Sequence, residues 1–126
     1  MPHPPNRFNK LRLVRQETKV FTVTVVDGDK RAAKLNGADV VLTVSESAGG
    51  VAVLTKNVGN GVLITDASKG KATITLTSAD TAGLEAKTYK YDVWVVYPDD
   101  PPVRHPVIRS ADLIVSESVT DFSAVS

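Results

Sequence analysis

The residues that could perform acid–base or metal chemistry are few and widely spaced in this sequence. It contains two histidines, His3 near the N-terminus and His105 next to Pro106. A catalytic or metal-binding histidine needs partner groups held within reach. Asp99 or Asp100 could approach His105 across a turn, but little else converges on it. We therefore expect His105 to be a solvent-exposed residue without a catalytic role.

A calcium loop is suggested by the Asp-Gly-Asp run at residues 27–29, whose two acids have the spacing that opens such a loop. Arg31 stands where a third oxygen ligand should be, and no glutamate follows at the required position. We interpret residues 27–29 as a turn. The acidic pair Asp99 and Asp100 beside prolines is interpreted in the same way, so we predict no metal site.

Nucleophilic catalysis also lacks its components. The chain has no cysteine, which excludes thiol chemistry, thiolate zinc sites and a disulfide scaffold. The glycine clusters are not followed by the Lys-Ser/Thr of a phosphate-binding loop. No base stands in a recognisable frame with the serines considered, which are Ser45, Ser47, Ser116 and Ser118. We predict that the protein is not an enzyme and carries no cofactor.

The composition indicates which elements must position any binding residues. The 126 residues include 20 Val, 12 Thr and 4 Ile, against 9 Leu and 1 Met, which favours strands over helices. Apolar residues alternate with polar ones in short segments separated by turn residues. Ser78 is expected to cap one or two helical turns that end at Gly83, with Leu84 packed on the edge of the domain. The strands are predicted near residues 11–14, 19–26, 40–44, 51–56, 62–65, 72–76, 89–97 and 105–116.

About eight short strands with no long helix predict an all-β domain, an immunoglobulin-like antiparallel β-sandwich of two sheets with one short helical turn. The domain is expected to cover residues 11–116. Residues 1–10, with three prolines, are predicted to form an extended arm, and residues 117–126 a C-terminal tail. No apolar run is long enough for a membrane helix, and no signal peptide is evident.

The two ends of the chain carry opposite charge, although the net charge is only +1. The first 15 residues contain four basic residues and no acid, and residues 111–126 contain three acids and no base. So small a net charge argues against nucleic acid as a partner. The basic arm is either a solvated tail or a strap onto an acidic neighbouring subunit.

Trp94 is the most informative single residue. If Tyr91, Val93 and Val95 face the core, then Trp94 and Val96 face outward. Two interpretations stay open: the indole is covered by a loop or by the N-terminal arm, or it anchors an interface with another subunit. The candidate interface residues are Trp94, Val96, Val41, Val26, Arg7, Lys10, Arg12 and Phe122.

The order and spacing of four segments resemble a known group of domains. Residues 15–25 are similar to the opening strand pair of small phage virion domains, of the kind found at the N-terminus of phage baseplate upper proteins. Residues 36–44 resemble their "loop, then Gly-Ala-x-Val" strand, residues 61–81 their central hairpin and cap, and residues 88–95 their Tyr-x-Tyr-Asp strand. Together the resemblance covers most of the predicted domain.

The resemblance implies a non-enzymatic structural part of a tailed bacteriophage virion, made in the host cytoplasm and present in many copies. Baseplate upper proteins continue into a long distal region, whereas this chain ends shortly after its last predicted strand. We therefore expect an accessory decoration or adaptor subunit that binds larger capsid, neck or tail and baseplate subunits. The alternative is a carbohydrate- or cell-surface-binding β-sandwich module, with Trp94 and one or two tyrosines as its platform.

Overall fold

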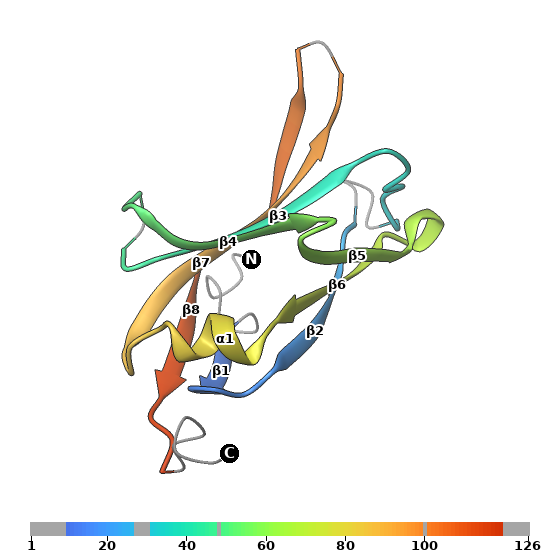
Figure 1. Ribbon diagram of the computed structural model, residues 1–126. Coiled ribbons are helices and arrows are strands. Elements are labelled where there is room, and N and C mark those ends of the chain that lie inside the picture. Colours follow the sequence, from blue (N-terminus) through green and yellow to red (C-terminus); the bar gives the residue numbers. More distant parts are fainter. Residues whose placement is uncertain (1–9, 27–30, 48, 100, 120–126) are drawn as a thin grey trace.

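Eight β-strands dominate the computed structural model, which describes residues 10–26, 31–47, 49–99 and 101–119 (Figure 1). The all-β prediction is confirmed. A short α-helix, α1 (Ser78–Ala82), and one 3₁₀ helix, η1 (Ala67–Lys69), accompany the strands. The strands are β1 (Leu11–Val14), β2 (Lys19–Thr24), β3 (Asp39–Ser45), β4 (Ala52–Val58), β5 (Gly61–Asp66), β6 (Lys71–Leu76), β7 (Thr88–Tyr97) and β8 (Val103–Ser116).

The strands form one sheet in the order β1-β8-β7-β3-β4-β5-β6-β2, which curls nearly into a barrel. β1 pairs with β8 in parallel, so the expectation of wholly antiparallel sheets is wrong. The turn after β1 explains this arrangement. Arg15 donates its backbone N–H to Ser116 O, and Gln16 adopts a φ of 77°. The chain thus leaves β1 beside the end of β8 and crosses to β6, which places β1 and β2 at opposite edges.

The core lies inside the curled sheet and follows the predicted alternation. In β7 the buried residues are Tyr91, Val93 and Val95, whereas Trp94 and Val96 are half-buried on the outer face. Burial raises the pKa of Tyr91 to about 12, because the phenolate would lose its hydration. Other fully buried aliphatic side chains include Leu35, Val40, Leu42, Val44, Ile74, Leu76 and Leu113.

The β7–β8 hairpin projects beyond the rest of the sheet (Figure 1). Pro101 and Pro102 lie in its connection, and β8 begins at Val103, two residues earlier than predicted. In the register of the two strands Trp94 lies opposite Pro106. The projection carries the ends of both strands away from the core, so residues 101–106 are exposed.

Helix α1 is capped by Thr77, so the prediction of Ser78 as the cap is wrong by one residue. Thr77 Oγ1 accepts from the Asp80 backbone N–H, and Asp80 Oδ2 accepts from the Thr77 N–H. This capping box needs an acid three residues after the cap, and Thr77 has one whereas Ser78 does not. Leu84 follows α1 and is 4% exposed, as predicted, and Tyr89 Oη accepts from the Glu85 N–H at 2.9 Å.

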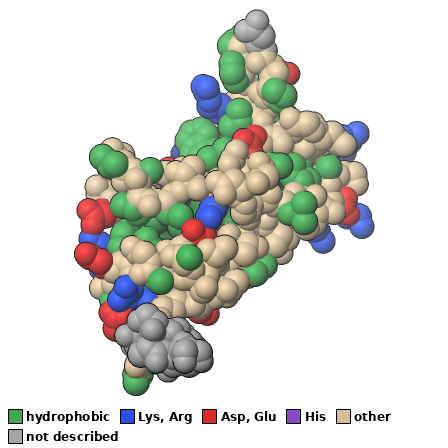
Figure 2. Space-filling view, in the orientation of Figure 1, with side chains coloured by type: hydrophobic (Ala, Val, Ile, Leu, Met, Phe, Trp, Pro, Cys, Tyr) green, Lys and Arg blue, Asp and Glu red, His purple; other side chains and the backbone are tan. Residues whose placement is uncertain are grey.

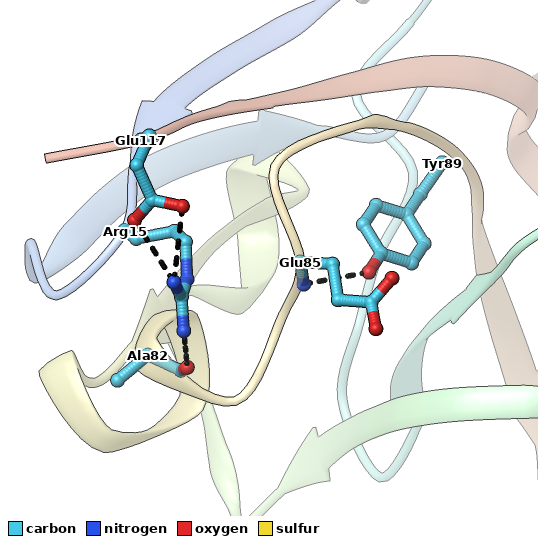
Figure 3. A network of polar contacts seen from close by, with 5 residues as sticks. All are labelled: Arg15, Ala82, Glu85, Tyr89 and Glu117. Atoms are coloured by element: carbon cyan, nitrogen blue, oxygen red, sulfur yellow. Dashed lines mark hydrogen bonds and ion pairs between the residues drawn. The ribbon is translucent and has the colours of Figure 1, made fainter.

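Polar contacts fasten the β1–β2 turn to α1 and to the end of β8 (Figure 3). Arg15 Nη1 donates to both carboxylate oxygens of Glu117, at 2.9 and 3.2 Å, and Arg15 Nη2 donates to Ala82 O at 2.8 Å. Thr81 Oγ1, which is fully buried, donates to Glu17 O at 2.7 Å. The crossing between the two edges of the sheet is therefore held at a defined place.

Candidate interaction surface

An apolar patch lies on the outer face of the sheet where β3, β7 and β8 run side by side. Val41 of β3 pairs with Trp94 of β7, which pairs in turn with Pro106 of β8. Val96 follows on the same face of β7, and Val41, Trp94 and Val96 are all half-buried. We call these four residues the Trp94 patch. Hydrophobic side chains gather at the base of the projecting hairpin in Figure 2.

Acidic side chains with satisfied hydrogen bonds border the Trp94 patch. Asp39, opposite Val96, accepts from the Val58 N–H at 2.9 Å. Asp92, two residues before Trp94, accepts from the Ser110 N–H. An apolar centre inside a polar rim is the usual composition of a protein–protein contact.

Charged residues occupy the other end of the same outer face. Lys90 of β7 and Asp112 of β8 form an ion pair. The hydrogen bond from Lys90 is the main reason that the pKa of Asp112 lies below its ordinary value; partial burial opposes it, and Lys10 adds a smaller attraction. Arg12 is opposite Ile114 and exposed, and Lys10 is also exposed. This end is therefore polar, in contrast to the Trp94 patch.

The candidate interface residues predicted from the sequence are thus divided among several places. Trp94, Val96 and Val41 come together, whereas Lys10 and Arg12 lie at the β1 edge. Val26, which is 57% exposed, instead lines a cavity with Tyr97 and His105. Arg7 and Phe122 lie outside the described residues, as do residues 27–29 of the predicted turn.

A buried ion pair was missed by the sequence predictions. Lys56 of β4 reaches across to α1, where its Nζ lies 2.8 Å from Asp80 Oδ2. The two side chains are 10% and 17% exposed. Burial, the largest single effect, raises the pKa of Asp80, but the hydrogen bonds from Lys56 and Thr77 together lower it below its ordinary value. The alternation of Leu54 with Lys56 was the available signal, because it assigns the lysine to the inner face.

The Lys56–Asp80 pair joins strand β4 to helix α1. The aliphatic part of Lys56 lies over Gly61, where a Cβ atom would come within 2.7 Å of Lys56 Cδ. Gly61 also has a φ of 92°, which glycine adopts without strain. Its lack of a side chain therefore allows this backbone conformation and leaves room for the Lys56 side chain. Both charged groups are used in structural contacts.

The described part of the chain contains no group of three or more His, Cys, Asp or Glu side chains placed to hold a metal ion. Among its helices, none has the length and apolar character needed to cross a membrane. A scan against protein-family models and a search of curated proteins found no match to this chain. We therefore take the Trp94 patch as the candidate interaction surface.

Proposed function

We propose that this protein is a non-enzymatic structural subunit of a tailed bacteriophage virion, an accessory decoration or adaptor piece. It binds larger capsid, neck or tail and baseplate subunits through the Trp94 patch. The observation that carries the docking role is Trp94, a half-buried indole between Val41 and Pro106 on an outer sheet face. The virion role is supported by the resemblance of the four sequence segments.

We also propose that the sheet has immunoglobulin-like sandwich topology. Such sandwiches place strands C′, C, F and G in one sheet and B, E and D in the other. In chain order these correspond to β4-β3-β7-β8 and β2-β6-β5, which are neighbours here in the same order. The bond between Tyr89 Oη and the Glu85 N–H supports the same topology, because these folds often carry a tyrosine that bonds back to the preceding corner.

The energetic role of Trp94 follows from its position. An indole at the centre of a contact loses its remaining exposure on docking, and truncation of such an anchor costs about 2 kcal/mol or more of binding energy. That cost corresponds to about a 30-fold weaker complex. The polar rim formed by Asp39 and Asp92 should contribute orientation rather than most of the affinity.

The test is co-sedimentation of the purified chain with phage particles that lack it. Trp94→Ala and Val41→Lys, two changes within the patch, should each reduce the bound amount at limiting protein concentration. Val20→Ala is the matched control, because Val20 is 55% exposed on β2, away from the patch. Equal binding by all variants, with unchanged melting temperatures, would remove the Trp94 patch as the docking site.

The alternative function, a carbohydrate- or cell-surface-binding module, requires an aromatic platform. The register places Val41 and Pro106 beside Trp94, so a stacking surface there would consist of a single ring. A glycan array on the purified protein separates the two functions. Specific binding that Trp94→Ala abolishes would favour the carbohydrate-binding module over the structural subunit.

A further inference from the structure

Strand β2 lies at one edge of the curled sheet. It pairs with β6 on one side, and no other strand of the described chain pairs with its opposite side. A cavity of about 260 Å³ lies against residues 21–24, so there is empty space beside this edge. An edge strand presents backbone N–H and C=O groups that can bond to an added strand. The edge of β2 is therefore a place where extended chain can dock.

The bonding pattern between β2 and β6 determines which backbone groups of β2 point to the open edge. Val25 donates its N–H to Gly70 O at 2.8 Å, in the same register as the antiparallel pairing of β2 with β6. Directly opposite residues in such a pair alternate between bonded and non-bonded. The odd-numbered residues of β2 therefore bond toward β6. The N–H and C=O groups of Val20, Thr22 and Thr24 point to the open edge.

We propose that β2 of a second copy of this chain docks antiparallel against this edge, with a two-fold axis at Thr22. The axis places Thr22 opposite the partner's Thr22 and Val20 opposite the partner's Thr24. Each outward N–H of these three residues then meets a C=O of the other copy. Shifting the pairing by two residues would leave one of the three opposite a residue outside β2. Only the symmetric register uses all of them.

The side chains along this edge favour a second copy as the occupant. Edge strands are commonly protected by charges, prolines or bulges, and residues 20–24 contain none of these. Lys19, the charged residue of β2, falls opposite the partner's Val25, so no like charges meet along the pairing. On the inner face the half-buried Phe21 lies opposite the partner's Val23, and such aromatic and β-branched pairs stabilise neighbouring strands.

The size of the contact indicates a weak dimer. The six residues of β2 span about 20 Å at roughly 3.4 Å each. A strip of this length buries less than the roughly 1,200 Å² of a stable interface. Dimerisation should therefore depend on concentration and be most complete where many copies are held close together. The proposal does not depend on the virion role, because β2 lies away from the Trp94 patch on β3, β7 and β8.

A single introduced cysteine in the full chain tests this register, because the sequence contains no other. Thr22→Cys places two thiols opposite each other, with Cα atoms about 5.5 Å apart, within the range of a disulfide. Val20→Cys is the matched control on the same face of β2, because its two copies lie about 14 Å apart along the strands. Thr22→Cys should form the covalent dimer about tenfold faster than Val20→Cys at equal concentration. Equal rates, or a faster Val20→Cys, would overturn the proposal.

Sedimentation equilibrium of the full chain supplies an independent readout. Thr22→Pro removes an N–H that points to the open edge, so the bonds between β2 and β6 are kept. This variant should dimerise about tenfold more weakly or worse, whereas Thr22→Val, the control, should dimerise like the native chain.

A native chain that stays monomeric up to about 1 mM would contradict the proposal, as would an unweakened dimer of Thr22→Pro. Trp94→Ala should leave the dimer unchanged, because the Trp94 patch lies on other strands. Loss of the dimer in Trp94→Ala would assign self-association to the Trp94 patch and refute the pairing of β2 strands.

Discussion

Asp80→Asn removes the negative charge opposite the Lys56 ammonium while keeping a side chain of nearly the same shape. In the native protein Asp80 Oδ2 lies 2.8 Å from Lys56 Nζ and also accepts from the Thr77 N–H. The carbonyl oxygen of asparagine can still accept the Thr77 N–H, so the capping box of α1 is kept. The substitution therefore isolates the electrostatic part of the contact, because the lysine stays in place without a counter-charge.

The size of the effect follows from distance and burial. At 2.8 Å and an effective dielectric constant near 20, the gross attraction is about 6 kcal/mol. Desolvation of both charged groups offsets much of this attraction. The side chains keep 10% and 17% exposure, which weakens the effect further. We expect Asp80→Asn to lower the free energy of unfolding by about 2–3 kcal/mol, as for a charged hydrogen bond with one partner removed.

Lys56→Met keeps the aliphatic packing over Gly61 and removes the ammonium. Asp80 then retains its bonds with Thr77, so the cost should be about 1 kcal/mol. In the double variant the two losses should not add, and a coupling energy of about 1–2 kcal/mol is expected. Urea unfolding of the native protein, the two single variants and the double variant measures this coupling energy. If the free energy of unfolding decreases by about 2 kcal/mol per M urea, the midpoint of Asp80→Asn should shift by about 1 M. A coupling energy below about 0.3 kcal/mol would refute the ion pair as a stabilising contact.

Three further predictions concern single residues. The pKa of Asp80 is lower in the folded state than its ordinary 3.8. The stability that Asp80 contributes is therefore complete above pH 3.8 and is lost as the pH falls through the folded pKa. Between about pH 5 and 2 the free energy of unfolding should decrease more steeply for the native protein than for Asp80→Asn. Tyr89→Phe leaves the partly buried Glu85 N–H without its acceptor and should cost about 1–1.5 kcal/mol in urea unfolding; a loss below about 0.3 kcal/mol would contradict this role. Gly70 has a φ of 70°, and an added Cβ would lie 2.4 Å from Val25 O, so Gly70→Ala should cost about 3 kcal/mol or more. Gly59 has a φ of 88°, but an added Cβ would have nothing within 4 Å, so Gly59→Ala should cost only about 1 kcal/mol. Equal melting temperatures for the two alanine variants would show that the contact of the Cβ with Val25 O does not destabilise Gly70→Ala.

Residue alternation was sufficient to predict the strands and their inner faces. In β6 the inward residues Ala72, Ile74 and Leu76 alternate with threonines, and all three are fully buried. The outward direction of Trp94 followed from the same rule applied to β7. Periodicity reports which way a side chain points because successive residues in a strand alternate between faces.

Strand neighbours and long-range contacts could not be obtained in this way. The parallel pairing of β1 with β8 depends on the crossing turn at Gln16, which has positive φ without being glycine. The Lys56–Asp80 contact joins residues that belong to different elements, and no local pattern relates them. Val26 was a candidate interface residue like Trp94, but its place in a cavity with Tyr97 depends on the order of the strands, which alternation does not report.

Electron cryo-microscopy of phage particles that carry a labelled copy of this chain tests the proposed docking role. We expect density for the curled sheet on the particle, with the outer face of β3, β7 and β8 against a larger subunit and Trp94 buried in the contact. Particles without the chain would contradict the virion role. Density attached through another surface, with Trp94 facing solvent, would contradict the docking site.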